Sequence, residues 1–206
     1  ISVWLIFCIP SVIILFFEYF PEFRTHPNFL YSIARGSKII LMYKWDPKEA
    51  VDIIERENVT RITAVPTVVA DLVAEASTQN KSLETLEFLG AGGAKRPPPQ
   101  VGVEKKALPS TDIASGYGMT ETSPLTNADF AEPELTKPGS IGPAAPDTEE
   151  KIVDVENEEL QLPAGEIGEL MVRGPQVMTG YFNNPEATEE TLTADGWIHT
   201  GDIARM

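Results

Sequence analysis

The sequence predicts an α/β fold in which a parallel sheet with crossover helices is followed by a small antiparallel, barrel-like subdomain. Between residues 38 and 89, apolar or β-branched runs alternate with helical patterns over short links, which is typical of a parallel sheet. Beyond residue 129 the chain becomes rich in Glu, Asp and Pro, and two short strand patterns then flank a polar turn. Ligands of parallel sheets bind beyond the carboxyl ends of the strands, so candidate residues are sought there.

Each element of the first half has its own local signal. Asp46 can cap a helix whose first position is Pro47 and whose capping-box partner is Glu49. Thr67 is expected to cap the next helix, after Pro66 ends a β-branched run. The expected strands are 39–42, 59–65, 86–89 and 111–114, and the two helices are expected to end near residues 57 and 77.

Less regular patterns follow. The prolines at 97–99 fit either a rigid connector or the entry to a helix over 100–108, which Gly102 would weaken. Strands are expected at 150–155 and 168–172 around a polar turn, and Asn184 is expected to cap a short helix that ends near residue 192.

The first 36 residues form a divergent segment that the sequence explains least. Residues 1–17 are uncharged and apolar, but they are short for a membrane span, are interrupted by Pro10, and lack the basic region and cleavage site of a signal peptide. A buried segment is favoured, and a membrane anchor is the alternative. Residues 18–32 are interpreted as irregular. The expected boundaries are then 37–128 for the α/β subdomain and 129–206 for the β-rich subdomain.

Composition excludes several classes of partner. The 206 residues carry a net charge of −15, which argues against nucleic acid or an anionic membrane surface as the main partner. One cysteine, Cys8, excludes an internal disulfide, and two separated histidines, His26 and His199, offer no Cys/His metal cluster. A reducing, cytoplasmic compartment is expected.

The densest group of chemically useful residues runs from Ser115 to Pro124, which we expect to be a glycine-bearing loop after a strand. Its two glycines allow a ligand to approach the backbone, and Tyr117 between them offers a flat face for a planar ring such as a nucleobase. Thr120 offers a hydroxyl for a phosphate oxygen, and Glu121 offers a carboxylate for a hard cation such as Mg²⁺. The alternative is a plain glycine-rich turn with an N-capping threonine.

Two further sites complement this stretch. The glycine-rich loop 90–94 follows the strand at 86–89, and that strand is expected to neighbour the one before Ser115. Asp202 follows Thr200 and Gly201, so its carboxylate can accept both hydroxyls of a ribose. An Asx turn at a strand end is the alternative for Asp202.

Four stretches together resemble one family. GAGGA at 90–94, GYGMTETSP at 116–124, GEIGELMVRGPQVMTGYFNNPEAT at 165–188 and DGWIHTGDIARM at 195–206 are similar to motifs of the AMP-forming adenylating enzymes. Within that family the chain looks most like the fatty-acid and other acyl-CoA synthetases, over about residues 33–206. The resemblance implies part of the large N-terminal domain of such an enzyme. The expected partners are ATP or AMP, Mg²⁺, coenzyme A and a small carboxylic acid, with a fatty acid favoured.

The resemblance also implies roles for individual residues. Tyr117 packs on the adenine and Asp202 holds the ribose. Thr120 contacts a phosphate oxygen and Glu121 sits at the Mg²⁺, so these two are the expected catalytic residues and Glu121 is the expected metal ligand. The expected cofactor-binding residues are Gly92, Gly93, Ala94, Ser115, Gly116, Tyr117, Gly118, Met119, Thr120 and Asp202. Trp197 and His199 are expected to be structural.

The chain departs from the family pattern in ways that lower the expected activity. It shows no Ser/Thr/Gly-rich phosphate loop ending in Pro-Lys, and no segment after Met206, where the family keeps a hinge and a lysine-bearing C-terminal domain. The run Lys95 to Pro99 also differs from the commoner apolar continuation of its loop. We therefore expect a fragment with little or no ligase activity. A nucleotide-binding or regulatory module without catalysis is the alternative.

Overall fold

The computed structural model describes residues 12–16, 31–123, 125–129 and 140–206. The chain divides into two compact units, one made of Ile1–Gly116 and Asp129–Gly142 and the other of Tyr117–Ala128 and Pro143–Met206. Within the described residues, no helix combines the length and the apolar character needed to cross a bilayer.

The main sheet has six strands in the order β2-β1-β3-β4-β5-β6. The strands are β1 (Val12–Phe16), β2 (Lys38–Met42), β3 (Arg61–Ala64), β4 (Phe88–Ala91), β5 (Asp112–Gly118) and β6 (Leu125–Ala128). Every pairing from β2 through β5 is parallel. The predicted parallel sheet with crossover helices is therefore confirmed.

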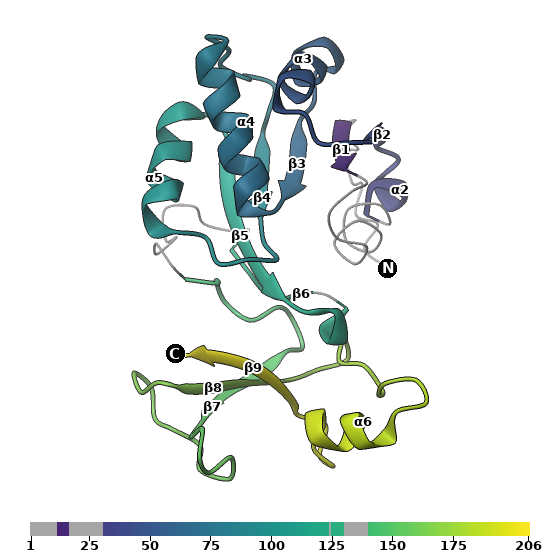
Figure 1. The fold of residues 1–206 in the computed structure, drawn as a ribbon, viewed down its shortest axis with the longest axis vertical. Coiled ribbons are helices and arrows are strands. Elements are labelled where there is room, and N and C mark those ends of the chain that lie inside the picture. The colour runs from purple at the N-terminus through teal and green to yellow at the C-terminus, as the bar shows by residue number, and fades with distance from the viewer. Residues whose placement is uncertain (1–11, 17–30, 124, 130–139) are drawn as a thin grey trace, which may run out of the picture. The chain divides into compact units, whose positions relative to one another are not determined.

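The helices of the first unit are α2 (Tyr31–Arg35), α3 (Pro47–Glu57), α4 (Pro66–Thr78) and α5 (Pro98–Ala107). Along the sheet, α4 packs between α3 and α5 (Figure 1). The predicted cap of α3 is confirmed, because the Asp46 carboxylate accepts a hydrogen bond from the backbone N–H of Glu49 at 2.9 Å. The prolines at 97–99 open α5, which decides in favour of a helix there.

The predicted cap at Thr67 is wrong. Helix α4 begins two residues earlier than expected, at Pro66, and its N-cap is Val65, which makes no side-chain cap hydrogen bond. The physical reason lies in the proline, whose fixed φ suits the first helical position and whose missing N–H needs no partner there.

The apolar core of the first unit lies between these helices and the sheet. Ile54 of α3, Leu72 of α4 and Leu89 of β4 are among its fully buried side chains. Burial of one such side chain contributes about 1.5–3 kcal/mol. This core fixes the strands whose carboxyl ends carry the predicted site residues.

Two short elements near the N-terminus were not anticipated. Strand β1 lies between β2 and β3, within the apolar run predicted to be buried, and α2 begins at Tyr31, inside the stretch expected to be irregular. The rest of those two predictions falls on residues 1–11 and 17–30, outside the described residues. The stretch rich in Glu, Asp and Pro that begins beyond residue 129 likewise includes residues 130–139, which are also outside them.

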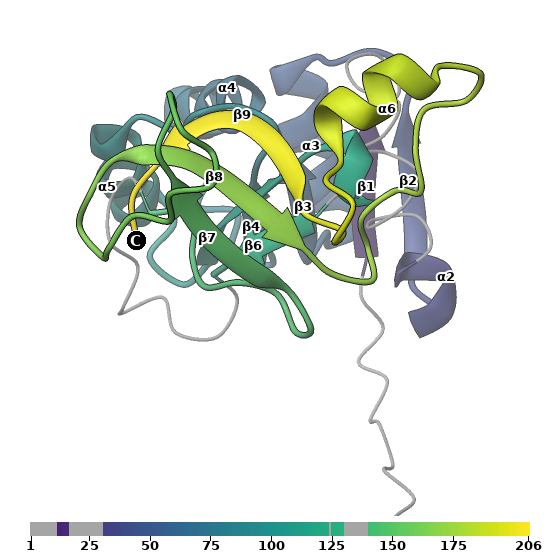
Figure 2. The ribbon, with the colours of Figure 1, turned by 90° about the horizontal axis from the view of Figure 1, so that it is seen from below.

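The second unit contains a three-stranded antiparallel sheet in the order β7-β8-β9 (Figure 2). Its elements are β7 (Glu149–Val153), β8 (Gly168–Arg173), α6 (Pro185–Thr191) and β9 (Ile198–Ala204). Asn184 caps α6 as predicted, accepting from the N–H of Ala187 at 3.2 Å. Within the described residues the sheet is open, with β8 in the middle, and no closed barrel forms.

Trp197 is structural, as predicted. Its side chain is buried with Val153 and Met171 in the small core of the second unit. The side-chain cations of Lys151 and Arg173 lie 4.5 and 4.7 Å from the centroid of its ring, where a cation is attracted to the aromatic face.

Candidate functional site

In the first unit, the two strands that carry the glycine-bearing segments are neighbours, as predicted, although Gly90 and Ala91 of the expected loop are the last residues of β4. Ala91 of β4 pairs with Ser115 of β5, so the loop that begins at Gly92 starts beside Gly116. The N–H of Gly92 donates to the carbonyl of Ala64 at 3.2 Å. Gly93 has a φ of +77°, a conformation that favours glycine. Ala94 is exposed.

The expected loop after residue 114 is wrong in its first part, because Ser115 to Gly118 continue strand β5. Both glycines of this stretch therefore have extended backbone. The pairing of β5 with β4 ends at Ser115, and β6 follows β5 in the sheet order. The hydroxyl of Thr126 in β6 donates to the carbonyl of Tyr117 at 3.2 Å, so the extension gains its partner from a strand later in the chain.

The turn after β5 presents the two predicted catalytic residues. Thr120–Thr122 form one turn of 3₁₀ helix with Met119 as its N-cap. Thr122 stabilises this turn, since its hydroxyl accepts from the N–H of Met119 at 3.1 Å and donates to the Met119 carbonyl at 3.0 Å. Thr120 is exposed, which leaves its hydroxyl accessible to a ligand.

In the second unit, Tyr117 and Asp202 are in direct contact although 85 positions separate them. The phenol hydroxyl donates to Oδ2 of Asp202 at 2.6 Å. Burial, together with this hydrogen bond to a carboxylate, raises the pKa of Tyr117 well above its usual range. The phenol therefore stays protonated at neutral pH and remains a donor. The fold thus brings together the residues predicted for adenine and for ribose.

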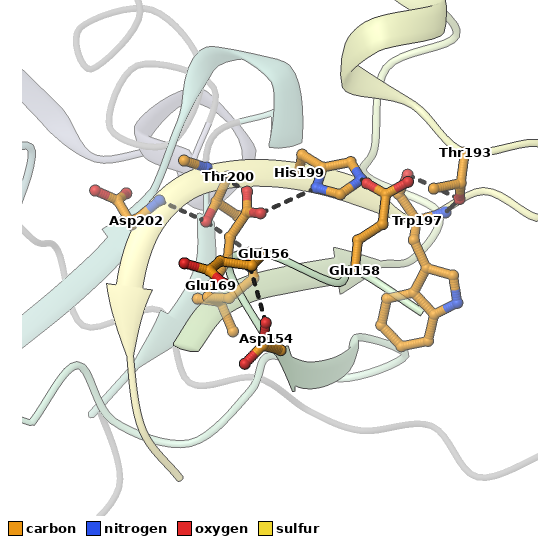
Figure 3. Close-up of polar contacts among 11 residues, drawn as sticks. Asp154, Glu156, Glu158, Glu169, Thr193, Trp197, His199, Thr200 and Asp202 are labelled. Atoms are coloured by element: carbon orange, nitrogen blue, oxygen red, sulfur yellow. Dashed lines mark hydrogen bonds and ion pairs between the residues drawn. The ribbon is translucent and has the colours of Figure 1, made fainter. Parts of the chain in front are cut away.

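Asp202 lies in strand β9, directly after Gly201, and hydrogen bonds from its neighbours fix this part of the strand. The N–H of Asp202 donates to the Thr200 hydroxyl at 3.1 Å, and that hydroxyl donates to the Leu170 carbonyl at 2.7 Å. The N–H of Gly201, whose φ is +71°, donates to Oε1 of Glu169 at 3.0 Å. Figure 3 shows Thr200 and Glu169 beneath this part of β9, with the Asp202 side chain directed away from them. The Asp202 carboxylate is exposed, as ribose binding requires.

His199 extends this support. Its Nδ1 lies 3.1 Å from Oε2 of Glu169, and its Nε2 lies 3.2 Å from Oε2 of Glu158 (Figure 3). The structural role expected of His199 is consistent with these contacts. The two glutamates were missed, because only the fold brings the turn that carries Glu158 and strand β8 to this ring.

Glu121 has a partner that was also missed. The Tyr181 hydroxyl donates to Oε1 of Glu121 at 2.8 Å, and the N–H of Met178 donates to the Glu121 carbonyl at the same distance. The hydrogen bond to Glu121 raises the pKa of Tyr181 above its usual value. Tyr181 lies in the GPQVMTGYFNNP part of the third resembling stretch, which was the available signal.

The carboxyl of Glu150, on β7 of the second unit, was not predicted to take part in the site. Burial raises its pKa, and a hydrogen bond with the Asn127 side chain partly offsets that effect. Its Oε1 atom is buried and has no hydrogen-bond partner among the described residues. Its charge also contributes to the raised pKa of Tyr117, so this carboxyl belongs to the electrostatic surroundings of the candidate site.

Comparison with known proteins identifies the family. Residues 10–182 match the model of the AMP-binding enzyme family. The chain is 33% identical over 196 residues to 4-coumarate–CoA ligase 5 of Oryza sativa subsp. japonica, covering 94% of this chain and 36% of that protein. It is 39% identical over 178 residues to a long-chain-fatty-acid–CoA ligase of Bacillus subtilis (strain 168), covering 85% and 31%.

A solved structure leads to the same family. ATP-bound MatB from Rhodopseudomonas palustris matches 95% of this chain and 38% of its own, with 29% identity and a TM-score of 0.76. The chain thus spans about a third of the length of these relatives. The resemblance to AMP-forming adenylating enzymes is confirmed, and this chain belongs to the AMP-binding enzyme family.

Proposed function

We propose that this chain forms the adenylate-binding part of an AMP-forming acid–thiol ligase. In that reaction a carboxylate attacks the α-phosphate of ATP and expels pyrophosphate, and the thiol of coenzyme A then attacks the acyl-adenylate and expels AMP. The observation that carries the proposal is the 2.6 Å hydrogen bond between Tyr117 and Asp202. It joins the residues proposed for adenine and ribose in one place.

The contact suits nucleotide binding for a physical reason. The hydrogen bond fixes the Tyr117 ring, so an adenine that packs on it finds a surface already ordered. One oxygen of the Asp202 carboxylate accepts the hydrogen bond from the phenol, but each carboxylate oxygen has two acceptor positions. Enough acceptor capacity therefore remains for the two hydroxyls of a ribose.

Glu121 and Thr120 fit the phosphate end of the nucleotide. Mg²⁺ is usually held by one or two carboxylates, with phosphate oxygens and waters completing its octahedron. Glu121 would supply one such carboxylate, and no group of three or more metal-binding side chains occurs among the described residues. Bound Mg²⁺ would neutralise phosphate charge. Tyr181 orients the carboxylate of Glu121, and Thr120 offers a hydroxyl to a phosphate oxygen.

The substrate acid is proposed to be a fatty acid, on the strength of the sequence resemblance. One of the relatives is named for long-chain fatty acids and another for 4-coumarate, so an aromatic acid is the competing class. Tight-binding analogues of the two adenylates, dodecanoyl and 4-coumaroyl sulfamoyl-adenosine, would separate these classes. Stronger binding of the dodecanoyl analogue is expected, and preference for the coumaroyl analogue would overturn the fatty-acid assignment. A cytoplasmic location also remains a prediction, based on the single cysteine.

Titration of the 206-residue chain with AMP in a calorimeter tests the core of the proposal. Saturable binding is expected in the wild type and should be lost in Tyr117→Ala and in Asp202→Ala. Tyr43→Ala and Asp52→Ala are matched controls, because both side chains are exposed in the first unit, outside the proposed contact. A wild-type chain that does not bind AMP, or binding that both site variants retain, would refute the nucleotide site.

Pyrophosphate release separates binding from catalysis. If AMP binds but no pyrophosphate is released from ATP with any acid in a fatty-acid panel, the chain is a nucleotide-binding module rather than a ligase. Acid-dependent release would instead support the ligase.

A further inference from the structure

A buried arginine of the first unit contacts β5 next to residues of the proposed nucleotide site. Arg96, in the segment between β4 and α5, is 9% exposed. One guanidinium nitrogen donates to the Ala114 carbonyl at 3.1 Å and to the Ser115 hydroxyl at 3.0 Å. The other donates to the carboxylate of Glu104. Arg96 therefore contacts both the middle of β5 and helix α5.

Glu104 connects Arg96 to further hydrogen bonds through Gln100. This carboxylate on α5 is 1% exposed, and its second oxygen accepts from the Gln100 amide at 2.7 Å. The same amide nitrogen lies 2.7 Å from the carbonyl of Pro66, the first residue of α4. The network thus connects the segment after β4, the middle of β5, helix α5 and the start of α4.

Packing alone gives no reason for an ion pair at this place. Removing two charges from water is costly, and apolar side chains of similar volume often stabilise a core as well or better. Burial lowers the pKa of Arg96 to about 10, which is still far above neutral, so the guanidinium stays charged at pH 7. The Nε atom has no hydrogen-bond partner among the described residues. What the pair provides and apolar packing does not is directional contact with the backbone and hydroxyl beside Gly116.

We propose that Arg96 is a positioning residue for nucleotide binding: paired with Glu104, it fixes the Ala114–Ser115 backbone and the Ser115 hydroxyl where β5 enters the candidate site. The proposal rests on the proposed nucleotide-binding function. It accounts for a feature that set this chain apart in sequence, the charged Lys95-Arg96 in a loop where an apolar continuation is commoner.

The test uses four forms of the 206-residue chain: Arg96→Lys, Arg96→Met, the double variant Arg96→Met/Glu104→Met, and a surface control, Lys38→Met/Glu57→Met. The control removes an exposed ion pair of the same unit. The double variant removes both buried charges together, so it should keep a melting temperature near that of the wild type even if Arg96→Met does not fold.

AMP affinity distinguishes positioning from mere stability. We expect the double variant to bind AMP about tenfold more weakly or worse, because small displacements of positioning groups have large effects. Arg96→Lys keeps the charge but not the planar fork and should also bind weakly. The surface control should bind as the wild type does. A double variant that binds AMP as tightly as the wild type would overturn the proposal.

Hydrogen–deuterium exchange measures the order of the β5 backbone directly, without any bound nucleotide. Amides at 114–116 are expected to exchange faster in the double variant than in the wild type, while those of α3 keep their rates. If the wild type fails to bind AMP, the proposed function falls and the exchange rates alone decide the positioning claim. Unchanged exchange at 114–116 would then refute it.

Discussion

Two polar networks support the predicted nucleotide-binding residues, and they differ mainly in burial. In the first unit, the side chains of Arg96 and Glu104 are 7% and 1% exposed. In the second, His199 and Glu169 are each 18% exposed and Glu158 is 70% exposed. Water can replace a lost partner in the second network but not in the first. Loss of a charged partner should therefore lower the free energy of unfolding much more in the first network than in the second.

The largest expected effect comes from breaking the buried pair. Glu104→Ala leaves the Arg96 guanidinium buried without its counter-charge and should lower the free energy of unfolding by about 3–5 kcal/mol. Urea denaturation followed by circular dichroism measures this change. Glu57→Ala removes a surface carboxylate that pairs with Lys38 and Arg56; it is the matched control and should change the stability far less. Equal losses in the two variants would contradict the role given to burial.

A smaller effect is expected when the exposed network loses its central carboxylate. Glu169→Ala removes the acceptor for the Gly201 N–H and the partner of His199, yet water can reach both groups. The stability should fall by about 1 kcal/mol or less, while AMP affinity falls by about threefold to tenfold because the part of β9 that carries Asp202 loosens. Calorimetry and thermal unfolding measure the two quantities. Glu158→Ala, at the solvent end of the network, should leave both nearly unchanged, and a larger effect there would reverse the expected order.

The smallest expected effect depends on pH and distinguishes adjacent carboxyls on β7. Burial raises the pKa of Glu150, so its contribution to stability is fully present below its unfolded pKa and is lost as pH rises through its folded pKa. Glu150→Gln stays neutral and should be more stable than the wild type at pH 7, with the difference vanishing near pH 4.

Glu149 provides a control of opposite sign. Its hydrogen bond with Arg173 lowers its pKa, so its contribution is present at neutral pH and is lost as pH falls. Glu149→Gln should therefore be the less stable protein at pH 7. Melting temperatures of both variants and of the wild type at pH 7 and pH 4 test these two predictions. Changes of the same sign in the two variants would show that burial does not distinguish them.

The elements that sequence reasoning anticipated are those with local causes. The cap at Asp46 and the alternation of strands with helices depend on residues close together in the chain, and both are found in the structure. Thr67 failed as a cap because Pro66 can already occupy the first helical position. Strand β1 and the extension of β5 through Gly118 were missed, because their partner strands lie elsewhere in the sequence.

The candidate site follows the same rule. The family resemblance singled out Tyr117 and Asp202, and the fold places them in contact. The contacts of Glu121 with Tyr181 and of His199 with Glu158 bring together residues whose spacing carries no recognisable pattern. The roles of the residues in binding and catalysis stay predictions. Supporting contacts of this kind are set by tertiary packing, which a single sequence does not reveal.

The most direct test of the central claim is a crystal structure of this chain with AMP. The account predicts that adenine packs against the Tyr117 ring and that the ribose hydroxyls donate to the Asp202 carboxylate, with Tyr117 still bonded to Asp202. AMP bound away from these two residues would contradict the assignment of the nucleotide site.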